Sequence, residues 1–210
     1  MIFLLLAAAA AATSAPSSTA IDAERAFASD AQRIGQWAAF RKYAAPDAIM
    51  FNPQAVWARD YLAGRKEPRR AVSWTPAASI MSCDRSVAVN GGPYSTPDGH
   101  HGRFTTVWLK GRTGWHWIYD GGEGTAKPVP SGPVPLVSVA SCKGKPTGAP
   151  IAAPLPQAPR GKLLDYGRGE SADRTLGWDW KIEKDGTRMF RVYQWTGRGY
   201  AQRVYQRVAP

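Results

Sequence analysis

Apolar residues recur with a helical spacing near the start of the chain. Between residues 22 and 43 they return every three or four positions, at Ala23, Phe27, Ala31, Ile34 and Ala38. This spacing places them on one face of an α-helix, so it predicts a helix with one buried face. Gly35 interrupts the pattern, and we expect a kink or a break into two helices there.

After Pro46 the pattern becomes that of short strands. Residues 48–53 predict a strand that Pro53 closes, and residues 57–64 predict a second, short helix. Further strands are expected at residues 78–83 and 87–89, before a hairpin with two-residue alternation. Helices followed by antiparallel strands are typical of an α+β fold in which the helices cover one face of the sheet.

The hairpin, TTVWLKGRTGWHWIYDGG at residues 105–122, has its turn at Arg112 and Thr113. Strict alternation about that turn pairs Trp108 with Trp117 and Thr106 with Tyr119. It predicts one aromatic face, made of Phe104, Trp108, Trp115, Trp117 and Tyr119.

Asp120 is expected on the other face of this hairpin, opposite Thr105 and diagonal to Arg103. Two interpretations remain open. Asp120 is either a strand-end carboxylate neutralised by its neighbours, or an acid at the mouth of an apolar cavity with a raised pKa and a role in proton transfer. An arginine partner lowers the pKa of a carboxyl group and favours the first interpretation.

The second half of the chain divides into two parts. Residues 123–160 are rich in proline and predict a linker, in which residues 136–140 form a docked edge strand. Residues 161–210 predict a three-strand meander with a turn at Asp185 and Gly186, which pairs Trp180 with Arg191 in a cation–π contact. Because so small a meander is marginally stable alone, its aromatic face should dock on the first domain, residues 21–122.

The chain begins with features of a secretory signal. Residues 1–20 combine an apolar run with small residues, and cleavage is expected before Ile21. The run is about half of the roughly 20 residues that span a bilayer, so we expect a periplasmic or secreted protein without stable membrane insertion. An oxidising compartment favours a disulfide between Cys83 and Cys142, and two buried free thiols are the alternative.

The formal net charge of +11 raises the question of a polyanionic partner. The basic residues are interspersed with acidic ones, and no nucleic-acid-binding motif is present, so we do not expect nucleic acid as a partner. The charge is interpreted as a solvated surface. An interaction module whose basic meander meets an anionic partner is an alternative, and a homodimer is left open.

Three local motifs resemble the nuclear-transport-factor-2-like superfamily, in particular its SnoaL-like and small exported members. They are Gly-x-x-x-Ala-Phe at residues 35–40, Phe-x-Pro at residues 51–53 and the tryptophan-rich hairpin, all within residues 22–122. The resemblance implies a cone-shaped α+β fold in which a curved antiparallel sheet and helices enclose a pocket. It implies no single activity, because the superfamily includes isomerases, cyclases, dehydratases and binding proteins.

The resemblance also bears on candidate catalytic residues. Ketosteroid isomerases of the superfamily use a tyrosine of the first helices and an aspartate near the first strand. Residues 22–42 contain no tyrosine, and Phe51 or Asn52 stands near the position of the aspartate, so isomerase chemistry is not expected. SnoaL-like cyclases rely on an acid in a late strand, for which Asp120 is the nearest match. Asp30 is the second candidate, because its helical spacing from Phe27 places it on the apolar face.

The sequence thus predicts a protein that binds a small apolar or aromatic molecule. An acid–base enzyme that uses Asp120 or Asp30 is the alternative. No cofactor is expected, since no phosphate-binding loop is present, and no metal site is expected, since His100 and His101 point to opposite sides of an extended chain. The residues expected to bind the ligand are Trp37, Trp74, Tyr94, Trp108, Trp117 and Tyr119.

Overall fold

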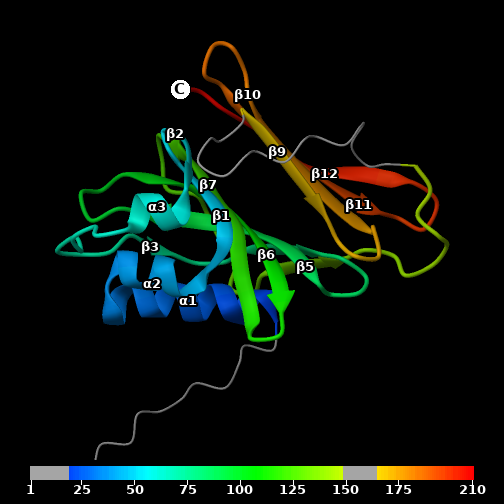
Figure 1. The fold of residues 1–210 in the computed structure, drawn as a ribbon, viewed down its shortest axis with the longest axis horizontal. Helices are drawn as coiled ribbons and strands as arrows, with labels where there is room; N and C mark the ends of the chain where they lie inside the picture. Colours follow the sequence, from blue (N-terminus) through cyan, green and yellow to red (C-terminus); the bar gives the residue numbers. More distant parts are fainter. Residues whose placement is uncertain (1–18, 149–164) are drawn as a thin grey trace, which may run out of the picture.

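The computed structural model describes residues 19–148 and 165–210. Within these residues the chain forms three layers: helices, a curved eight-stranded sheet, and a four-stranded sheet on the far side of it (Figure 1). The helices are α1 (Ala20–Ile34), α2 (Gln36–Tyr43) and α3 (Ala58–Leu62). The strands of the first sheet are β1 (Ala44–Asn52), β2 (Gln54–Trp57), β3 (Ser73–Trp74), β4 (Ala78–Met81), β5 (Val87–Ser95), β6 (His101–Gly111), β7 (Gly114–Thr125) and β8 (Leu136–Val139).

The predicted helix break at Gly35 is confirmed. Gly35 has a φ of 108°, a left-handed backbone conformation that favours glycine, and it separates α1 from α2. The first turn of α2 is capped from outside, because the Glu67 carboxylate accepts the backbone N–H groups of Trp37 and Ala38, each at 2.8 Å. At the other end, the Thr19 hydroxyl accepts the backbone N–H of Asp22 and begins α1.

The first sheet has the order β2-β1-β7-β6-β5-β4-β8, with β3 also paired to β5. It is a mixed sheet, which corrects the expectation of an antiparallel one. Strand β1 runs parallel to β7, and β8 runs parallel to β4. Long connections separate both pairs in sequence, and such connections permit parallel pairing where a tight hairpin does not. The expected edge strand in the proline-rich region is β8.

The two faces of the first sheet pack against different layers. The face toward the helices is covered by a cluster centred on Phe27, Trp108 and Trp117. The opposite face packs against the second sheet through a cluster that includes Tyr119 and Trp178. The second sheet, formed within residues 166–208, therefore lies against the face of the first sheet that is opposite the helices (Figure 1).

The second sheet corrects two expectations. It has four strands rather than three, in the order β12 (Tyr200–Val208), β11 (Arg188–Trp195), β10 (Leu176–Ile182) and β9 (Tyr166–Glu170). The turn after β10 is longer than expected, because Glu183 and Thr187 close it with a backbone hydrogen bond of 2.8 Å. The register therefore shifts by one residue, and each β11 side chain faces the other way.

As a result, Trp180 pairs with Phe190, and the expected contact between Trp180 and Arg191 is wrong. Arg191 instead donates two hydrogen bonds to Asp179, at 2.8 and 2.5 Å. The same shift turns Arg188 toward the first sheet, together with Phe190.

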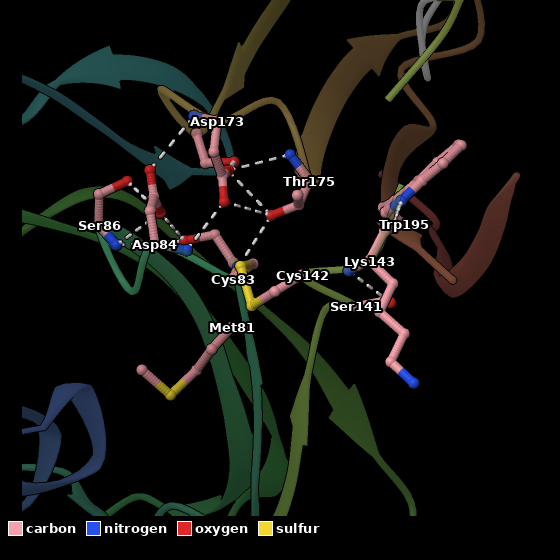
Figure 2. Close-up of a disulfide and its surroundings, with 12 residues drawn as sticks. Met81, Cys83, Asp84, Ser86, Ser141, Cys142, Lys143, Asp173, Thr175 and Trp195 are labelled. Atoms are coloured by element: carbon pink, nitrogen blue, oxygen red, sulfur yellow. Dashed lines mark hydrogen bonds between the residues drawn. A yellow bond between two sulfur atoms is a disulfide. The ribbon is translucent and has the colours of Figure 1, made fainter. Parts of the chain in front are cut away.

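A disulfide joins Cys83 to Cys142, with their Cα atoms 5.3 Å apart, which excludes the alternative of two free thiols (Figure 2). Beside it, two turns of similar sequence meet, SCDRSV at residues 82–87 and SADRTL at residues 171–176. In each turn the serine hydroxyl bonds the aspartate of the same turn. The two aspartates also exchange bonds, since each carboxylate of Asp84 and Asp173 accepts the backbone N–H of the other. These hydrogen bonds connect the turn at residues 82–87 of the first sheet to the turn at residues 171–176 of the second.

The expected signal segment, residues 1–20, lies outside the described residues except for Thr19 and Ala20. Ala20 is fully buried as the first residue of α1. Among the described helices, none is both long and apolar enough to cross a membrane.

Candidate functional site

A cavity of about 420 Å³ lies between the helices and the first sheet. Eight of the seventeen residues that line it are aromatic, and two carboxylates, those of Glu24 and Asp120, line it as well. Its lining comes from every helix and from five strands of the first sheet. The lining residues are Glu24, Phe27, Gln36, Trp37, Phe40, Met50, Phe51, Asn52, Tyr61, Val72, Trp74, Tyr94, Phe104, Thr106, Asp120, Gly121 and Gly122.

A β-bulge in the hairpin decides where Asp120 points. Trp108 pairs with Trp117 as expected, but Val107 pairs with Tyr119, so Ile118 is an extra residue in β7. After this bulge, each β7 side chain points to the face opposite to the one that strict alternation predicts. Tyr119 turns to the second sheet, and Asp120, which pairs with Thr106, turns to the cavity. The expectation that Asp120 and the tryptophans occupy different faces is wrong, and Asp120 pairs with Thr106 rather than with Thr105.

Asp120 also lacks the neutralising partner that the sequence suggested. No ion pair joins it to Arg103 or to another base in the described part of the chain, and its backbone partner on β1 is Met50. Burial raises the pKa of Asp120 to about 8, and the negative charge of Glu24 adds to the effect, while Arg188 opposes it. At neutral pH the carboxyl group is therefore mostly protonated, and it can donate as well as accept a hydrogen bond.

Glu24 is the second carboxylate of the cavity and is fully buried. Four side chains donate to it. Trp74 Nε1 lies 2.9 Å from Oε1, while Trp108 Nε1 at 2.6 Å, Asn90 Nδ2 at 3.4 Å and the Thr106 hydroxyl all meet Oε2. Burial raises the pKa of Glu24, and these hydrogen bonds counteract the rise. Four donors suit the ionised form, which only accepts hydrogen bonds.

The sequence interpretation did not identify Glu24, although a signal was present. Glu24 lies four positions after Ala20 and three before Phe27, so helical spacing places it on the buried face of α1. A glutamate on such a face needs hydrogen-bond partners inside the fold, because an unpaired buried charge is very costly.

Three of the six residues expected to bind a ligand line the cavity: Trp37, Trp74 and Tyr94. The other three do not line it. Trp108 and Trp117 are fully buried in the core beneath the helices, although Trp108 reaches the cavity indirectly through its bond to Glu24. Tyr119 is buried against the second sheet, stacked on Phe190 with ring centroids 4.5 Å apart.

Tyr94 lies over a part of the sheet where glycine leaves room for its ring. A Cβ atom at Gly102 would come within 2.3 Å of the Tyr94 ring, and one at Gly122 within 3.4 Å. The first distance is too short for a van der Waals contact, and the second is at its lower limit. The Tyr94 ring can therefore keep this position only because residue 102 has no side chain. Gly122, two residues after Asp120, thus lies against the Tyr94 ring in the wall of the cavity.

Another aromatic group includes Trp37 and Tyr61, whose rings meet edge to face at 6.2 Å between centroids. The Arg65 guanidinium lies over the Tyr61 ring at 3.7 Å, and the Asn52 side-chain amide donates to the Tyr61 hydroxyl. Arg65 is exposed, and Trp37 and Tyr61 are partly exposed. This side of the cavity therefore combines aromatic faces with polar groups that solvent reaches.

Asp30 is not among the residues that line the cavity. Its carboxylate is paired with Lys42 and Arg33, each at 2.5 Å, and accepts a bond from the Tyr43 hydroxyl. Burial acts to raise the pKa of Asp30, but the hydrogen bonds from Lys42 and Arg33 outweigh it and hold the pKa below the ordinary value. The described residues contain no group of three or more histidine, cysteine or acidic side chains placed to hold a metal ion.

No model of a known protein family matches the chain, and no curated protein sequence matches it. Similar solved structures include an NTF2-like (nuclear-transport-factor-2-like) protein of unknown function from Shewanella oneidensis MR-1. That likeness covers 47% of this chain and 91% of the other, at 17% identity and a TM-score of 0.39. An NTF2-like protein from Cytophaga hutchinsonii ATCC 33406 is similar over 50% of this chain and 93% of its own, at 13% identity and a TM-score of 0.41.

The architecture of residues 20–125 agrees with the sequence motifs in placing helices on a curved sheet, although the sheet is mixed rather than antiparallel. The helices pack on one face of a curved sheet, the aromatic hairpin forms the centre of that sheet, and a cavity lies between the two layers. The four-stranded sheet of β9–β12 is packed on the other face. Residues 20–125 therefore form an α+β unit in which three helices and a curved mixed sheet enclose a cavity.

Proposed function

We propose that the protein binds a small, largely aromatic or apolar molecule in the cavity between the helices and the first sheet. The observation that carries the proposal is the combination of volume and lining. About 420 Å³ lies within the range of roughly 300–1,000 Å³ that is usual for ligand sites, and aromatic residues with a few convergent polar groups are the usual lining.

The polar groups indicate what kind of molecule would fit. With a pKa of about 8, Asp120 presents a neutral carboxyl group at neutral pH, while the buried Glu24 is occupied by its four donors. A neutral polar group such as a hydroxyl or a carbonyl can pair with Asp120. The residues that line the cavity include no lysine, arginine or histidine side chain that could pair with an anionic group. The expected ligand is therefore a neutral aromatic molecule with a single polar substituent.

Calorimetric titration with 1-naphthol at pH 6.5 tests the proposal. We expect saturable binding of one molecule to the wild type, and at least tenfold weaker binding to Val72→Phe, whose larger side chain fills the cavity. Val137→Phe is the matched control, because it makes the same change on the exposed edge strand β8. Equal affinity in Val72→Phe and the wild type, or no binding to the wild type, would contradict the proposal.

Acid–base catalysis at Asp120 is a second candidate function, favoured by one observation. A cavity carboxyl group without a paired base, and with a pKa of about 8, is matched to proton transfer near neutral pH. Asp120 would be the proton donor or acceptor, and Glu24 would help to keep its pKa high. Asp30 has no part in this candidate mechanism, because its carboxylate is held by Lys42 and Arg33.

Exchange of the α-protons of 2-indanone in D₂O, followed by NMR, tests this second candidate. A catalytic Asp120 predicts exchange faster than in buffer alone, rising with pH through about 8 as the carboxyl group ionises. Asp120→Asn should lower the rate at least tenfold, and Asp179→Asn, which changes a carboxylate outside the cavity, should not. An unchanged rate in Asp120→Asn would remove Asp120 from this role.

We also propose that the chain is exported to the periplasm or secreted, with a signal segment at its start. The disulfide between Cys83 and Cys142 supports this, because such bonds persist in oxidising compartments. N-terminal mass spectrometry of the protein from its native host is the test. A mature chain that lacks the first residues would agree, whereas an intact Met1 on the abundant form would not.

A further inference from the structure

A second cavity, of about 290 Å³, lies at the junction of the two sheets. Its walls are mainly apolar side chains and backbone from β1, β2, β10 and the end of the chain. Arg188 is the basic residue among its lining, and Asp165, which is exposed, is the acidic one. The lining residues are Phe51, Pro53, Gln54, Ala55, Gly122, Asp165, Ile182, Gly186, Arg188, Val208, Ala209 and Pro210.

Arg188 is unusual for an arginine in being 7% exposed. It is the first residue of β11, and the alternation of that strand turns it toward the first sheet. Its Nη2 donates to the backbone oxygen of Gly122, and its guanidinium carbon lies 4.3 Å from the centroid of the Phe51 ring. Within the described residues no carboxylate is close enough to form an ion pair with it, and its Nε has no hydrogen-bond partner.

A buried cation without a counter-ion is costly, because transfer out of water is not compensated by a paired charge. A guanidinium group has five N–H donors in a planar arrangement. In Arg188 one of these donors bonds to a carbonyl oxygen, and an aromatic ring lies against the group. A carboxylate is the group that best matches the remaining donors in charge and geometry. The apolar walls around Arg188 would in turn receive the hydrocarbon part of such an anion.

We propose that this second cavity is a binding site for a small organic monocarboxylate, with Arg188 as the residue that binds its carboxylate group. Phe51, Ile182 and Val208 would contact the apolar body of the anion. The site is separate from the cavity of the proposed function, and its charge preference is the opposite. The main cavity is lined by Glu24 and Asp120, whereas the second presents a buried arginine.

The two sites are nevertheless neighbours. Phe51 and Gly122 line both cavities, and these are the residues that Arg188 contacts. The positive charge of Arg188 also lowers the pKa of Asp120. An anion bound to Arg188 would offset that charge, so occupation of the second cavity should favour the protonated form of Asp120 in the first.

The test follows binding of 4-fluorobenzoate by ¹⁹F NMR, with 4-fluorobenzamide as the neutral probe of similar shape. We expect the wild type to bind the benzoate at least tenfold more tightly than the benzamide. Arg188→Met should weaken benzoate binding at least tenfold. Arg198→Met is the matched control, because Arg198 is an exposed arginine in the turn before β12 and should leave the affinity unchanged.

Two further variants make the test independent of any effect of Arg188 on folding. Ala55→Leu fills the second cavity while it keeps the arginine, and should also abolish benzoate binding. Val72→Phe fills the main cavity and should leave benzoate binding unchanged, whatever it does to 1-naphthol. No saturable benzoate binding to the wild type, equal binding to Ala55→Leu and the wild type, or loss in Val72→Phe would overturn the proposal.

Discussion

Asp120→Asn tests whether the bulge places a titratable carboxyl group in a desolvated site. Burial and the charge of Glu24 raise the pKa of Asp120 to about 8 in the folded protein, from an ordinary value of 3.8. Between these two values the folded state holds a proton that the unfolded state has lost. The stability that this proton contributes is therefore complete below about pH 4 and is lost as the pH rises through about 8. Asparagine does not ionise and lacks this dependence.

The size of the effect follows from the difference between the two pKa values. Each pKa unit corresponds to about 1.4 kcal/mol, so the full difference sets an upper bound of about 6 kcal/mol above pH 8. Asp120 retains some contact with solvent, which reduces the effect. Between pH 5.5 and 7.5 we expect the free energy of unfolding of Asp120→Asn, relative to the wild type, to rise by about 1–3 kcal/mol.

Urea unfolding followed by tryptophan fluorescence, at half-unit steps from pH 5 to pH 9 and with the disulfide intact, measures this difference. The test uses only how the difference in free energy of unfolding changes with pH. An effect of the amide group that does not depend on pH therefore cancels. Asp179→Asn is the control carboxylate, because Asp179 is paired with Arg191. A difference between Asp120→Asn and the wild type that stays constant from pH 5 to pH 8 would refute the assignment of a raised pKa to Asp120.

Three other predictions concern the same framework. Glu24→Gln should lower the free energy of unfolding by about 1–3 kcal/mol, because an amide cannot accept from all four donors; unchanged urea unfolding would contradict this. Replacement of Cys83 and Cys142 by alanine should cost about 4 kcal/mol in thermal or urea unfolding, as expected for a bridge over 59 residues, and a loss below 1 kcal/mol would contradict it. Gly102→Ala should displace Tyr94 and weaken 1-naphthol binding in calorimetry, because the new Cβ atom would lie 2.2 Å from the Glu123 carbonyl oxygen and 2.3 Å from the Tyr94 ring. Gly199→Ala, at a glycine with open space around it and no left-handed φ, should leave that affinity unchanged.

The helices could be predicted from the sequence because their signal is local. The apolar spacing from Ala23 to Ala38 and the break at Gly35 both appear in the structure as α1 and α2. The Cys83–Cys142 bridge and the edge strand β8 were likewise predicted from composition and position. Strand β9 was missed, because YGRGE at residues 166–170 contains two glycines and has no apolar alternation.

The site was harder to predict, because it depends on single-residue shifts in register. The extra residue at Ile118 reverses the face of Asp120, and the longer turn at residues 183–187 reverses that of Arg188. A shift of one residue moves a side chain to the opposite face of a sheet, and composition does not reveal it. Asp120 and Arg188 are both charged, and each lines a cavity.

Native mass spectrometry of the protein purified from its native host, under non-denaturing conditions, tests directly whether the main cavity holds a small molecule. If the main cavity binds a small neutral molecule, the wild type should carry one such molecule of discrete mass, which is lost on denaturation. Val72→Phe, produced in the same host, should lack it, while Val137→Phe should retain it. A wild type that never carries a bound molecule, or an adduct that persists unchanged in Val72→Phe, would contradict ligand binding in this cavity.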